Sequence, residues 1–473
     1  MRSSAILFAL ASLSLFLTFG GLAGCKKSIN QNHPVIQNTV RVSLSTSGAE
    51  GNLDAVNEIP GISNDGRYVV FSSNATNLVP GDTNNAPDVF YRDNLSRTLI
   101  MVSVSLSGGP SDGASGTPSI SGDGRYVAFS SLASNLTGVA VPAGVKQIYV
   151  RDMQTGVTTL VSRASGASGL IADQNCDNPR LSNDGTYVVF ESLSNLLDGV
   201  IAGGDDNDTL SDIYRRKWID GTSAFPTDLI SFQSGFGTGS GKKATGSSNR
   251  PVVSSDGRYV AFDSDAADLV SATQDGAPDS NSTTDVFVRD TQTNRTVRCS
   301  VEYVGSNPAL VGPSRSASIS LDGQMVTFRS TSGSLNPAAQ ELATPNIYLR
   351  SWNGLSPFTE ILSVHTSGAT GGQNCDRPSI CGDGTKIAWQ SPSSALVNGD
   401  SNGVDDIFLR NRTTLQTSRE SVQTFGGQLD GPSDAPAYSA DGRYILFWSK
   451  ATNVVDDDTN GAADFFLRGP PFK

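Results

Sequence analysis

Short stretches in which hydrophobic and polar residues alternate recur along this chain of 473 residues. In Tyr68–Ser72, Val69 and Phe71 fall on one face, which is the period of two that is typical of a β-strand. An Asp65-Gly66 pair precedes it and suits the positive φ angles of a two-residue turn. No stretch shows sustained helical periodicity, so the pattern predicts an all-β protein.

Four strands can be placed in the first sixty-residue unit, and the unit then repeats. They are Pro60–Ser63, Tyr68–Ser72, Val89–Arg92 and Leu99–Val104. The Ser-x-Asp-Gly-Arg-Tyr-Val-x-Phe core of the unit begins at Ser63, and versions of it return at Ser121, Ser182, Ser254, Ser320, Cys381 and Ser439. Seven four-stranded units predict a seven-bladed β-propeller.

The two ends of the repeat region complement each other. The seventh unit stops after its third strand, at Arg468, and has no fourth. The missing strand is found at the start, where Thr39–Leu44 matches Thr296–Val301, a fourth strand of another unit. We therefore expect the N-terminal strand to complete the last blade, which removes an exposed sheet edge, and we place the propeller at residues 39–473.

The first 38 residues are predicted to be a targeting segment. Residues 1–24 have an apolar stretch, Ala5–Phe19, too short for a comfortable membrane span, and lead to Leu22-Ala23-Gly24-Cys25. That ending resembles a bacterial lipobox, which implies cleavage before Cys25 and its lipidation, with residues 25–38 as a flexible tether. Lys26 at the next position implies the outer membrane of a Gram-negative cell. The alternative is an ordinary secretory signal with a coincidental cysteine.

The repeat itself resembles a known family. Ser254–Phe262, Ser-Ser-Asp-Gly-Arg-Tyr-Val-Ala-Phe, is similar to the TolB-like, WD40-like PD40 β-propeller repeats, and the resemblance covers about residues 39–470. The Trp that often precedes the Ser in that family is Ile, Leu, Val or Tyr here. There is also no room for the separate α/β domain of TolB. The resemblance implies a protein-binding scaffold of the envelope, although some such propellers are attached to hydrolases.

An Asp-x-Asn/Asp-x-x-x-Asp motif lies between the second and third strands of five units. Oxygen ligands at its positions one, three and seven resemble the first half of a calcium loop, although no bidentate Glu follows. The alternative is a loop capped by its own hydrogen bonds. Units two and five lack the motif and carry Gln147 and Asn346 at the last position. The candidate residues are Asp82, Asn84, Asp88, Asp206, Asp208, Asp212, Asp279, Asn281, Asp285, Asp400, Asn402, Asp406, Asp458, Asn460 and Asp464.

Two further sets of residues favour structural roles. An arginine ends the third strand of every unit, and we expect it to pair with the Asp of the Asp-Gly turn, as Asp65. These arginines are Arg92, Arg151, Arg216, Arg289, Arg350, Arg410 and Arg468. The cysteines after Cys25 fit no zinc spacing and are expected to be buried free thiols; they are Cys176, Cys299, Cys375 and Cys381.

Composition and motif searches exclude several function classes. A net charge of −12 argues against nucleic acid, and against binding of an anionic membrane surface through the propeller itself. The chain has only two histidines, His33 and His365, so a mechanism that uses histidine as the general base is not favoured. The Gly109–Gly113 segment matches G-x-S-x-G but lies in a loop without a following helix. We therefore predict no catalytic residues and no certain cofactor, with Ca²⁺ as a candidate.

Residues that break the repeat are where a binding function is expected. Trp218 and Trp352 lie in the turns after two third strands. If exposed, they could anchor a binding partner; the alternative is that they pack against the protein itself. Three arginines precede first strands at the channel mouth, namely Arg250, Arg315 and Arg377. They are candidates for a binding surface; the alternative is that they form local ion pairs. The sequence predicts a lipid-anchored, non-enzymatic scaffold for an envelope protein or, less favoured, a glycan. The alternative is a carbohydrate-binding, hydrolase or lyase propeller whose site is the channel mouth.

Overall fold

The computed structural model describes residues 37–197, 209–219, 224–233, 243–270, 279, 281–302, 312–336, 344–354 and 356–472. The lipidation candidate Cys25 and the loop residues Asp206 and Asp208 lie outside these residues. Within them the protein is all-β, with one short 3₁₀ helix at Gly333–Leu335. No helix in this part of the chain is long and apolar enough to cross a membrane.

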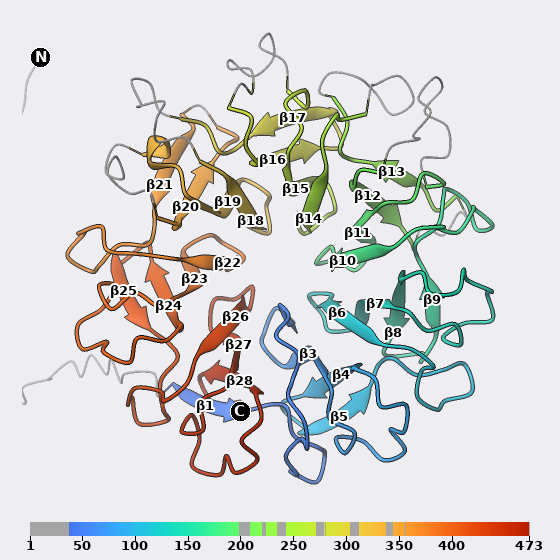
Figure 1. Ribbon diagram of the computed structural model, residues 1–473, viewed down its shortest axis with the longest axis horizontal. Helices are drawn as coiled ribbons and strands as arrows, with labels where there is room; N and C mark the ends of the chain where they lie inside the picture. Colours follow the sequence, from blue (N-terminus) through green and yellow to red (C-terminus); the bar gives the residue numbers. More distant parts are fainter. Residues whose placement is uncertain are drawn as a thin grey trace, which may run out of the picture. The chain divides into compact units, whose positions relative to one another are not determined.

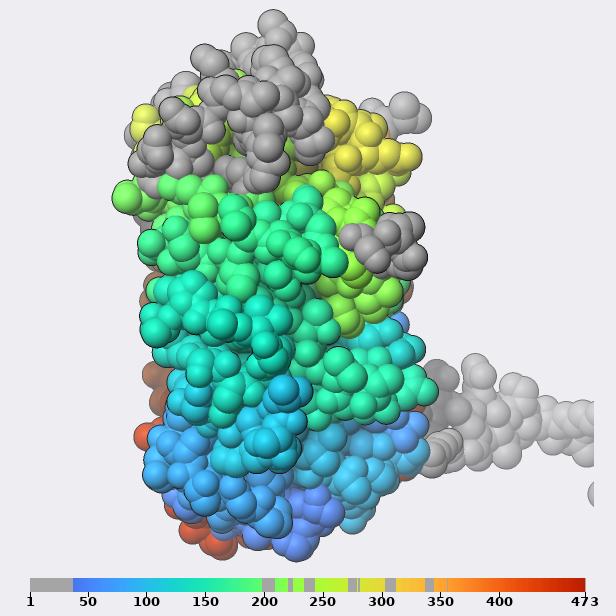
Figure 2. All heavy atoms as spheres, turned by 90° about the vertical axis from the view of Figure 1, so that its right-hand side faces the viewer, coloured from blue at the N-terminus to red at the C-terminus, as the bar shows by residue number. Residues whose placement is uncertain are grey.

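Seven four-stranded antiparallel sheets follow one another in chain order around a ring (Figure 1). Figure 2 shows one side of this ring, on which the sequence colours follow in order from blue through green to yellow. Blades 1 to 4 are β2–β5 (Gly61–Ile62, Tyr68–Ser73, Asp88–Asp93, Thr98–Met101), β6–β9 (Ser115–Ile120, Tyr126–Ser131, Gln147–Asp152, Thr158–Leu160), β10–β13 (Cys176–Leu181, Tyr187–Ser192, Asp212–Lys217, Thr227–Leu229) and β14–β17 (Ser248–Val253, Tyr259–Ser264, Asp285–Asp290, Arg295–Arg298). Blades 5 to 7 are β18–β21 (Ser314–Ile319, Met325–Ser330, Asn346–Ser351, Phe358–Ile361), β22–β25 (Asp376–Ile380, Lys386–Ser391, Asp406–Asn411, Gln416–Arg419) and β26–β28 (Ser433–Tyr438, Ile445–Ser449, Asp464–Gly469) with β1 (Asn38–Arg41). The predicted seven-bladed propeller is confirmed.

The closure predicted from the chain ends is also confirmed. β1 pairs antiparallel with β28, with Thr39 opposite Arg468 and Arg41 opposite Phe466. The N-terminal strand is therefore the outermost strand of blade 7, next to the last strand of the chain (Figure 1). This pairing joins residues more than 400 positions apart and holds the ring closed.

The core lies between adjacent blades. The cassette aromatic residue of each second strand, Phe in six blades and Trp389 in blade 6, stacks on an aromatic residue of the third strand; the ring centroids of Phe71 and Phe90 are 5.9 Å apart. Phe71 also contacts Phe465 of blade 7 at 5.4 Å. Each such pair contributes about 0.5–1.5 kcal/mol beyond the area it buries. The repeat of one buried ring per strand therefore produces both the blade and its packing on the next.

The Asp-Gly turns dock on the preceding blade. Gly66 has φ +75, and the ring of Tyr444 from blade 7 lies where its Cβ would be. Corresponding tyrosines cover Gly124, Gly185, Gly257 and Gly323, whereas Met325 covers Gly384. A glycine is required at these turns both by the left-handed backbone and by the neighbouring ring.

The prediction that the third-strand arginines pair with the Asp of the Asp-Gly turn is wrong. Asp65 accepts hydrogen bonds from the Ser63 hydroxyl and the Arg67 backbone amide within its own turn. The arginine that ties turn to strand is Arg67, which pairs with Asp93 at 2.8 Å. Six of the seven third-strand arginines instead donate to a threonine of the fourth strand, namely Arg151, Arg216, Arg289, Arg350, Arg410 and Arg468. The hydrogen-bonding groups of the guanidinium are taken up by the neighbouring fourth strand, which lies nearer than the turn.

The seventh third-strand arginine reaches the adjoining connection between blades. Arg92 donates to the carbonyl of Leu44, which follows β1, at 2.9 Å. The role of these arginines is structural, as expected. The four cysteines Cys176, Cys299, Cys375 and Cys381 are free and buried, which confirms the prediction. Burial raises the pKa of the Cys176 thiol to about 12, so it stays protonated and unreactive.

Candidate functional site

The loops that carry the sequence candidates gather on one face of the ring. Because strands alternate in direction, the starts of the first strands and the loops between second and third strands share a face, which we name the loop face. The Asp-Gly turns lie on the opposite face, which we name the turn face. Backbone bonds link the loop-face elements, as between the Ser115 amide and the Pro87 carbonyl at 2.8 Å.

The first strands carry a bulge where they enter the channel from the loop face. In six blades one residue adopts a positive φ of 47 to 59, and the register with the second strand shifts there; these are Thr117, Asn178, Arg250, Ser316, Arg377 and Ala435. A bulge re-aims a backbone group away from the ladder. Three of the re-aimed amides donate to carboxylates of the preceding blade: Thr117 to Glu58 and Arg250 to Glu191, both at 2.7 Å, and Ser316 to Asp263 at 3.1 Å.

These bulges surround a cavity of about 340 Å³ at the channel mouth. Charged side chains of both signs line it: Glu58, Arg180, Glu191, Arg250 and Arg377. The cavity is asymmetric, since its polar groups come from different positions in different blades. A larger hollow of about 640 Å³ lies beside β1 and the residues that follow β28, and we assign no site to it.

Burial separates the acids from the bases at this mouth. The Asp263 side chain is 0% exposed, while that of its ion-pair partner Arg250 is 44% exposed, with Nε 2.5 Å from Oδ2. Burial raises the pKa of Asp263 to about 6, against the opposing charge of Arg250. Burial also raises the pKa of Glu191, which accepts bonds from the Arg250 amide and the Asn178 side chain. The mouth therefore presents guanidinium groups to solvent and keeps these two carboxylates beneath them.

The structure brings the three predicted arginines together at the mouth. Arg250 pairs with Asp263, and Arg377 pairs with Asp434 at 3.2 Å and donates to Asn57 at 2.7 Å. Arg315 is exposed, on the strand beside them. Local ion pairing thus uses two of the three arginines and still leaves their side chains partly exposed.

The two predicted tryptophans lie elsewhere. Trp218 and Trp352 donate to the carbonyls of Gly185 and Gly323, which places both on the turn face. Each packs edge-on against a tyrosine of the preceding blade, Tyr126 or Tyr259. Trp352 is buried and Trp218 half-buried, which favours the packed alternative over the exposed anchor: their indoles stabilise the packing between blades.

Sequence reasoning missed the carboxylates of the mouth. Glu191 and Asp263 occupy the position on the second strand directly after the buried aromatic residue of the cassette. This position is Ser72, Ser130, Glu191, Asp263, Arg329, Gln390 and Trp448 in blades 1 to 7. An alignment of the seven cassettes would have shown this variable column, because it alternates with invariant core positions.

The acidic loops are capped by their own hydrogen bonds. The Asn at position three donates to the carboxylate at position seven in blades 1, 4, 6 and 7, as from Asn84 to Asp88 at 2.9 Å. A serine two residues after the fourth strand donates to the other oxygen of the same carboxylate, as from Ser103 to Asp88 at 2.5 Å. The Asn therefore positions the last Asp of the motif in these four blades.

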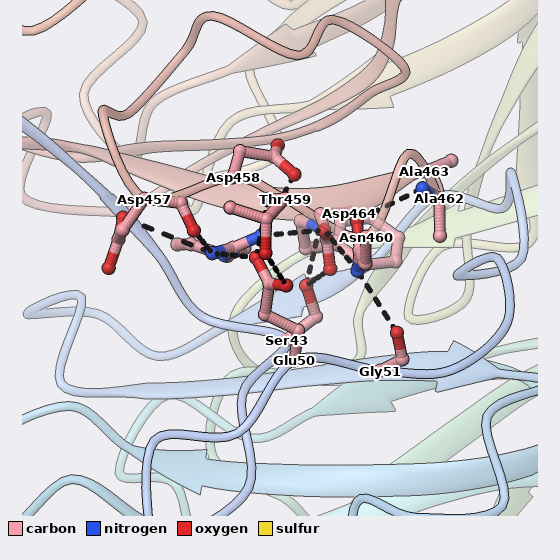
Figure 3. A network of polar contacts seen from close by, with 12 residues as sticks. Ser43, Glu50, Gly51, Asp457, Asp458, Thr459, Asn460, Ala462, Ala463 and Asp464 are labelled. Atoms are coloured by element: carbon pink, nitrogen blue, oxygen red, sulfur yellow. Dashed lines mark hydrogen bonds and ion pairs between the residues drawn. The ribbon is translucent and has the colours of Figure 1, made fainter.

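An arginine lies between the two carboxylates in three of these loops. In blade 7, Arg41 Nη1 contacts Asp458 at 3.1 Å and Asp464 at 3.2 Å, and Nη2 contacts Glu50 at 2.6 Å; Figure 3 shows this network. Arg298 joins Asp279 and Asp285 in the same way in blade 4, and Arg419 joins Asp400 and Asp406 in blade 6.

This arrangement revises the calcium prediction for blades 4, 6 and 7. A guanidinium takes the place of the ion among Asp279, Asn281, Asp285, Asp400, Asn402, Asp406, Asp458, Asn460 and Asp464. In blade 3, Lys243 forms an ion pair with Asp212. Across the described residues, no group of three or more His, Cys, Asp or Glu side chains is arranged to hold a metal.

Comparisons with known proteins identify the fold. No protein-family model and no curated protein matches the sequence. An oligogalacturonate lyase from Vibrio parahaemolyticus is similar at 12% identity over 92% of this chain and 93% of that chain, with a TM-score of 0.51. TolB from Acinetobacter baumannii matches at 17% identity over 65% of this chain and 54% of that chain, with a TM-score of 0.34.

A third similar structure is the β-propeller domain of the Trilobed protease from Pyrococcus furiosus. It matches at 9% identity over 88% of this chain and 95% of that chain, with a TM-score of 0.48. The chain spans about half the length of the Acinetobacter TolB. At these identities the likeness shows the propeller fold, which these proteins share whatever their activity.

The buried carboxylate of the mouth predicts a specific pH response. Because the pKa of folded Asp263 is about 6 and the ordinary value is 3.8, the folded state binds more protons in that window. Lowering the pH from 7 to 5 should therefore stabilise the wild type relative to Asp263→Asn by about 1 kcal/mol. Denaturant unfolding of both proteins at the two pH values measures this difference. An equal pH response of the two proteins would contradict a raised pKa at this site.

Proposed function

We propose that this protein is a lipid-anchored binding module of the bacterial cell envelope that takes an acidic segment of another envelope protein at its channel mouth. The observation that carries the proposal is the division of charge at the mouth. Arg250 and Arg377 have side chains 44% and 32% exposed, whereas those of Asp263 and Asp434 are 0% and 15% exposed. With the exposed Arg315, they offer donors to a carboxylate-bearing partner.

The negative net charge of the whole chain favours binding of an acidic partner at the mouth over binding elsewhere on the surface. At a net charge of −12, most of the surface repels an acidic partner, and the mouth is where attraction opposes that repulsion. The cavity beneath the arginines has room for a side chain or the end of a segment. The proposal therefore describes a scaffold without catalysis, in agreement with the absence of a catalytic motif in the sequence.

Charge reversal at the mouth tests the binding proposal. Arg315→Glu should lower partner capture in intact cells, by crosslinking and pull-down, at least about tenfold, as expected for an exposed arginine at the centre of an interface. The matched control is Arg97→Glu, because Arg97 is exposed in a turn of the opposite face. Capture of the same partner at equal yield by both variants would exclude the mouth as the binding site.

The anchor is tested separately. We propose that Cys25 is acylated after removal of residues 1–24 and that residues 25–38 tether the propeller, at the outer membrane. Cys25→Ala should then move the protein from the membrane fraction to the soluble fraction, because several acyl chains hold far more firmly than any contact of the acidic propeller. Fractionation and mass measurement of the N-terminal peptide decide it; an unmodified Cys25 in the wild type would refute lipidation.

One observation favours a second candidate function. Two carboxylates have raised pKa values: Glu191, which lines the cavity, and Asp263, which is buried behind the cavity residue Arg250. Such groups can serve as general acid and base on an acidic sugar. That enzyme would release products from acidic oligosaccharides, and Asp263→Asn would abolish the release. A binding module gives no product with either protein.

A further inference from the structure

The carboxylate pairs of blades 1, 4, 6 and 7 differ in one respect. In blades 4, 6 and 7, Nη1 of Arg298, Arg419 or Arg41 contacts Oδ1 of the first Asp and Oδ2 of the last, at 3.1 to 3.6 Å. The protein thus supplies a cation to each pair. The position of this arginine is fixed by the sheet register, since Arg298 lies opposite Phe287 and Arg419 opposite Phe408.

Blade 1 has the same loop without the arginine. The residue opposite Phe90 on its fourth strand is Met101. Among the residues that the structure describes, neither Asp82 nor Asp88 forms an ion pair, although Asn84 and Ser103 hold Asp88 as in the other blades. The pair in blade 1 therefore has the geometry of its counterparts and lacks their cation.

The carboxylate of Asp82 shows where that cation is missing. Asp82 is only 8% exposed, and its buried Oδ1 has no hydrogen-bond partner in the described part of the chain. Oδ1 of Asp279, the corresponding residue in blade 4, receives Nη1 of Arg298 at 3.3 Å. A buried carboxylate oxygen without a partner is strongly destabilising, so this position calls for a ligand.

We propose that blade 1 binds a calcium ion between Asp82 and Asp88, in the place that a guanidinium fills in three other blades. Two carboxylates match its charge, and hard oxygen atoms are its preferred ligands. Calcium tolerates irregular coordination completed by water and backbone carbonyls, whereas magnesium requires a near-ideal octahedron. The inference is independent of the proposed function, because it concerns another part of the loop face.

Asn84 has a positioning role in this site. Its side-chain nitrogen donates to Asp88 at 2.9 Å and to the Ser111 carbonyl at 3.0 Å, while its oxygen accepts from the Ala86 amide at 3.0 Å. Its oxygen is therefore engaged, and it acts by orienting Asp88. This distinguishes the site from the first half of a calcium loop, in which the third residue is itself a ligand.

Calcium titration of the chelator-treated full chain in detergent tests the proposal. Calorimetry should show one strong site per chain. The midpoint of thermal unfolding should rise by about 3 °C when calcium is present at a hundred times its dissociation constant. Magnesium at the same concentration should give a much smaller shift. The absence of binding, or equal responses to the two metals, would overturn the proposal.

Three variants locate the ion. Met101→Arg supplies the cation of blades 4, 6 and 7 and should abolish the calcium response without lowering the midpoint measured in chelator. Asp82→Asn should also abolish the response, so that the test survives if one variant fails to fold. The matched control Asp400→Asn changes the first Asp of blade 6 and should keep the response. Calcium binding that persists in both Met101→Arg and Asp82→Asn would overturn the assignment.

A protonated Asp82 is the competing explanation for the missing cation. Under that explanation calcium leaves the wild-type midpoint unchanged, and Asp82→Asn raises the midpoint because an amide replaces a buried acid of similar shape. This pair of results would overturn the proposal. A calcium-dependent midpoint in the wild type together with a calcium-independent one in Asp82→Asn supports it.

Discussion

Replacement of Arg41 by methionine is expected to lower the free energy of unfolding by about 3–5 kcal/mol, because it leaves buried charges without their partner. Arg41 is 5% exposed and contacts Glu50, Asp458 and Asp464. It also lies on β1, the strand that closes the ring. Its loss therefore acts on the cohesion of blade 7 and on the closure of the propeller together. Chemical denaturation of the full chain measures the change.

The matched control for Arg41→Met is Arg67→Met. Arg67 pairs with Asp93 at 2.8 Å, as close as the contacts of Arg41, but its side chain is 38% exposed. A solvent-screened pair of this kind contributes little to stability, so the effect of Arg67→Met should be much smaller than that of Arg41→Met. If the two replacements cost the same, the carboxylate network of blade 7 does not carry the closure that we assign to it.

The position of this network bears on the proposed anchor. The tether that we propose, residues 25–38, leads directly into β1, so tension on a membrane anchor acts on the strand that closes the ring. Arg41 and the β1–β28 pairing would then resist that tension. This gives a physical reason for the concentration of charge pairs at the first strand.

Replacement of Gly66 by alanine is expected to cost about 2–4 kcal/mol, the second-largest effect that we predict. Gly66 has φ +75, and an added Cβ would lie 2.3 Å from Cδ2 of Tyr444 in blade 7. Left-handed strain and a clash with a buried ring of the adjacent blade therefore add up. Thermal or denaturant unfolding measures the sum.

Gly442 separates the two contributions. It has nearly the same backbone, with φ +68, but its nearest neighbours are 3.7 Å from an added Cβ, since Lys386 stands where five of the other blades have tyrosine. Gly442→Ala should cost about 1 kcal/mol, from backbone strain alone. In a Tyr444→Ala background the extra cost of Gly66→Ala should disappear. Equal costs for the two alanines would show that docking of the turn on the ring contributes nothing.

The candidate site was only partly visible in the sequence. The arginines Arg250, Arg315 and Arg377 were found because they interrupt a repeat, and they do meet at the channel mouth. Asp263 and Glu191 were missed because a single carboxylate on a strand carries no motif. Trp218 and Trp352 also interrupt the repeat, yet they pack between blades. A break in a repeat thus marks a position that differs, and only its surroundings decide whether it binds.

The sequence by itself determined the repeating unit, the number of blades, the closing strand and the turn glycines. These follow from period-two alternation, from Asp-Gly turns and from counting, all of which act over a few residues. Tertiary structure alone decided which of the loop carboxylates form an ion pair with an arginine. The Asp-x-Asn-x-x-x-Asp motif reads alike in blades 1 and 7, but Arg41 reaches Asp464 from 423 positions away. In blade 1 the residue in the same place is Met101, and Oδ1 of Asp82 has no hydrogen-bond partner among the residues that the structure describes. The charge of a buried group depends on what the fold packs against it, and that partner often lies far along the chain.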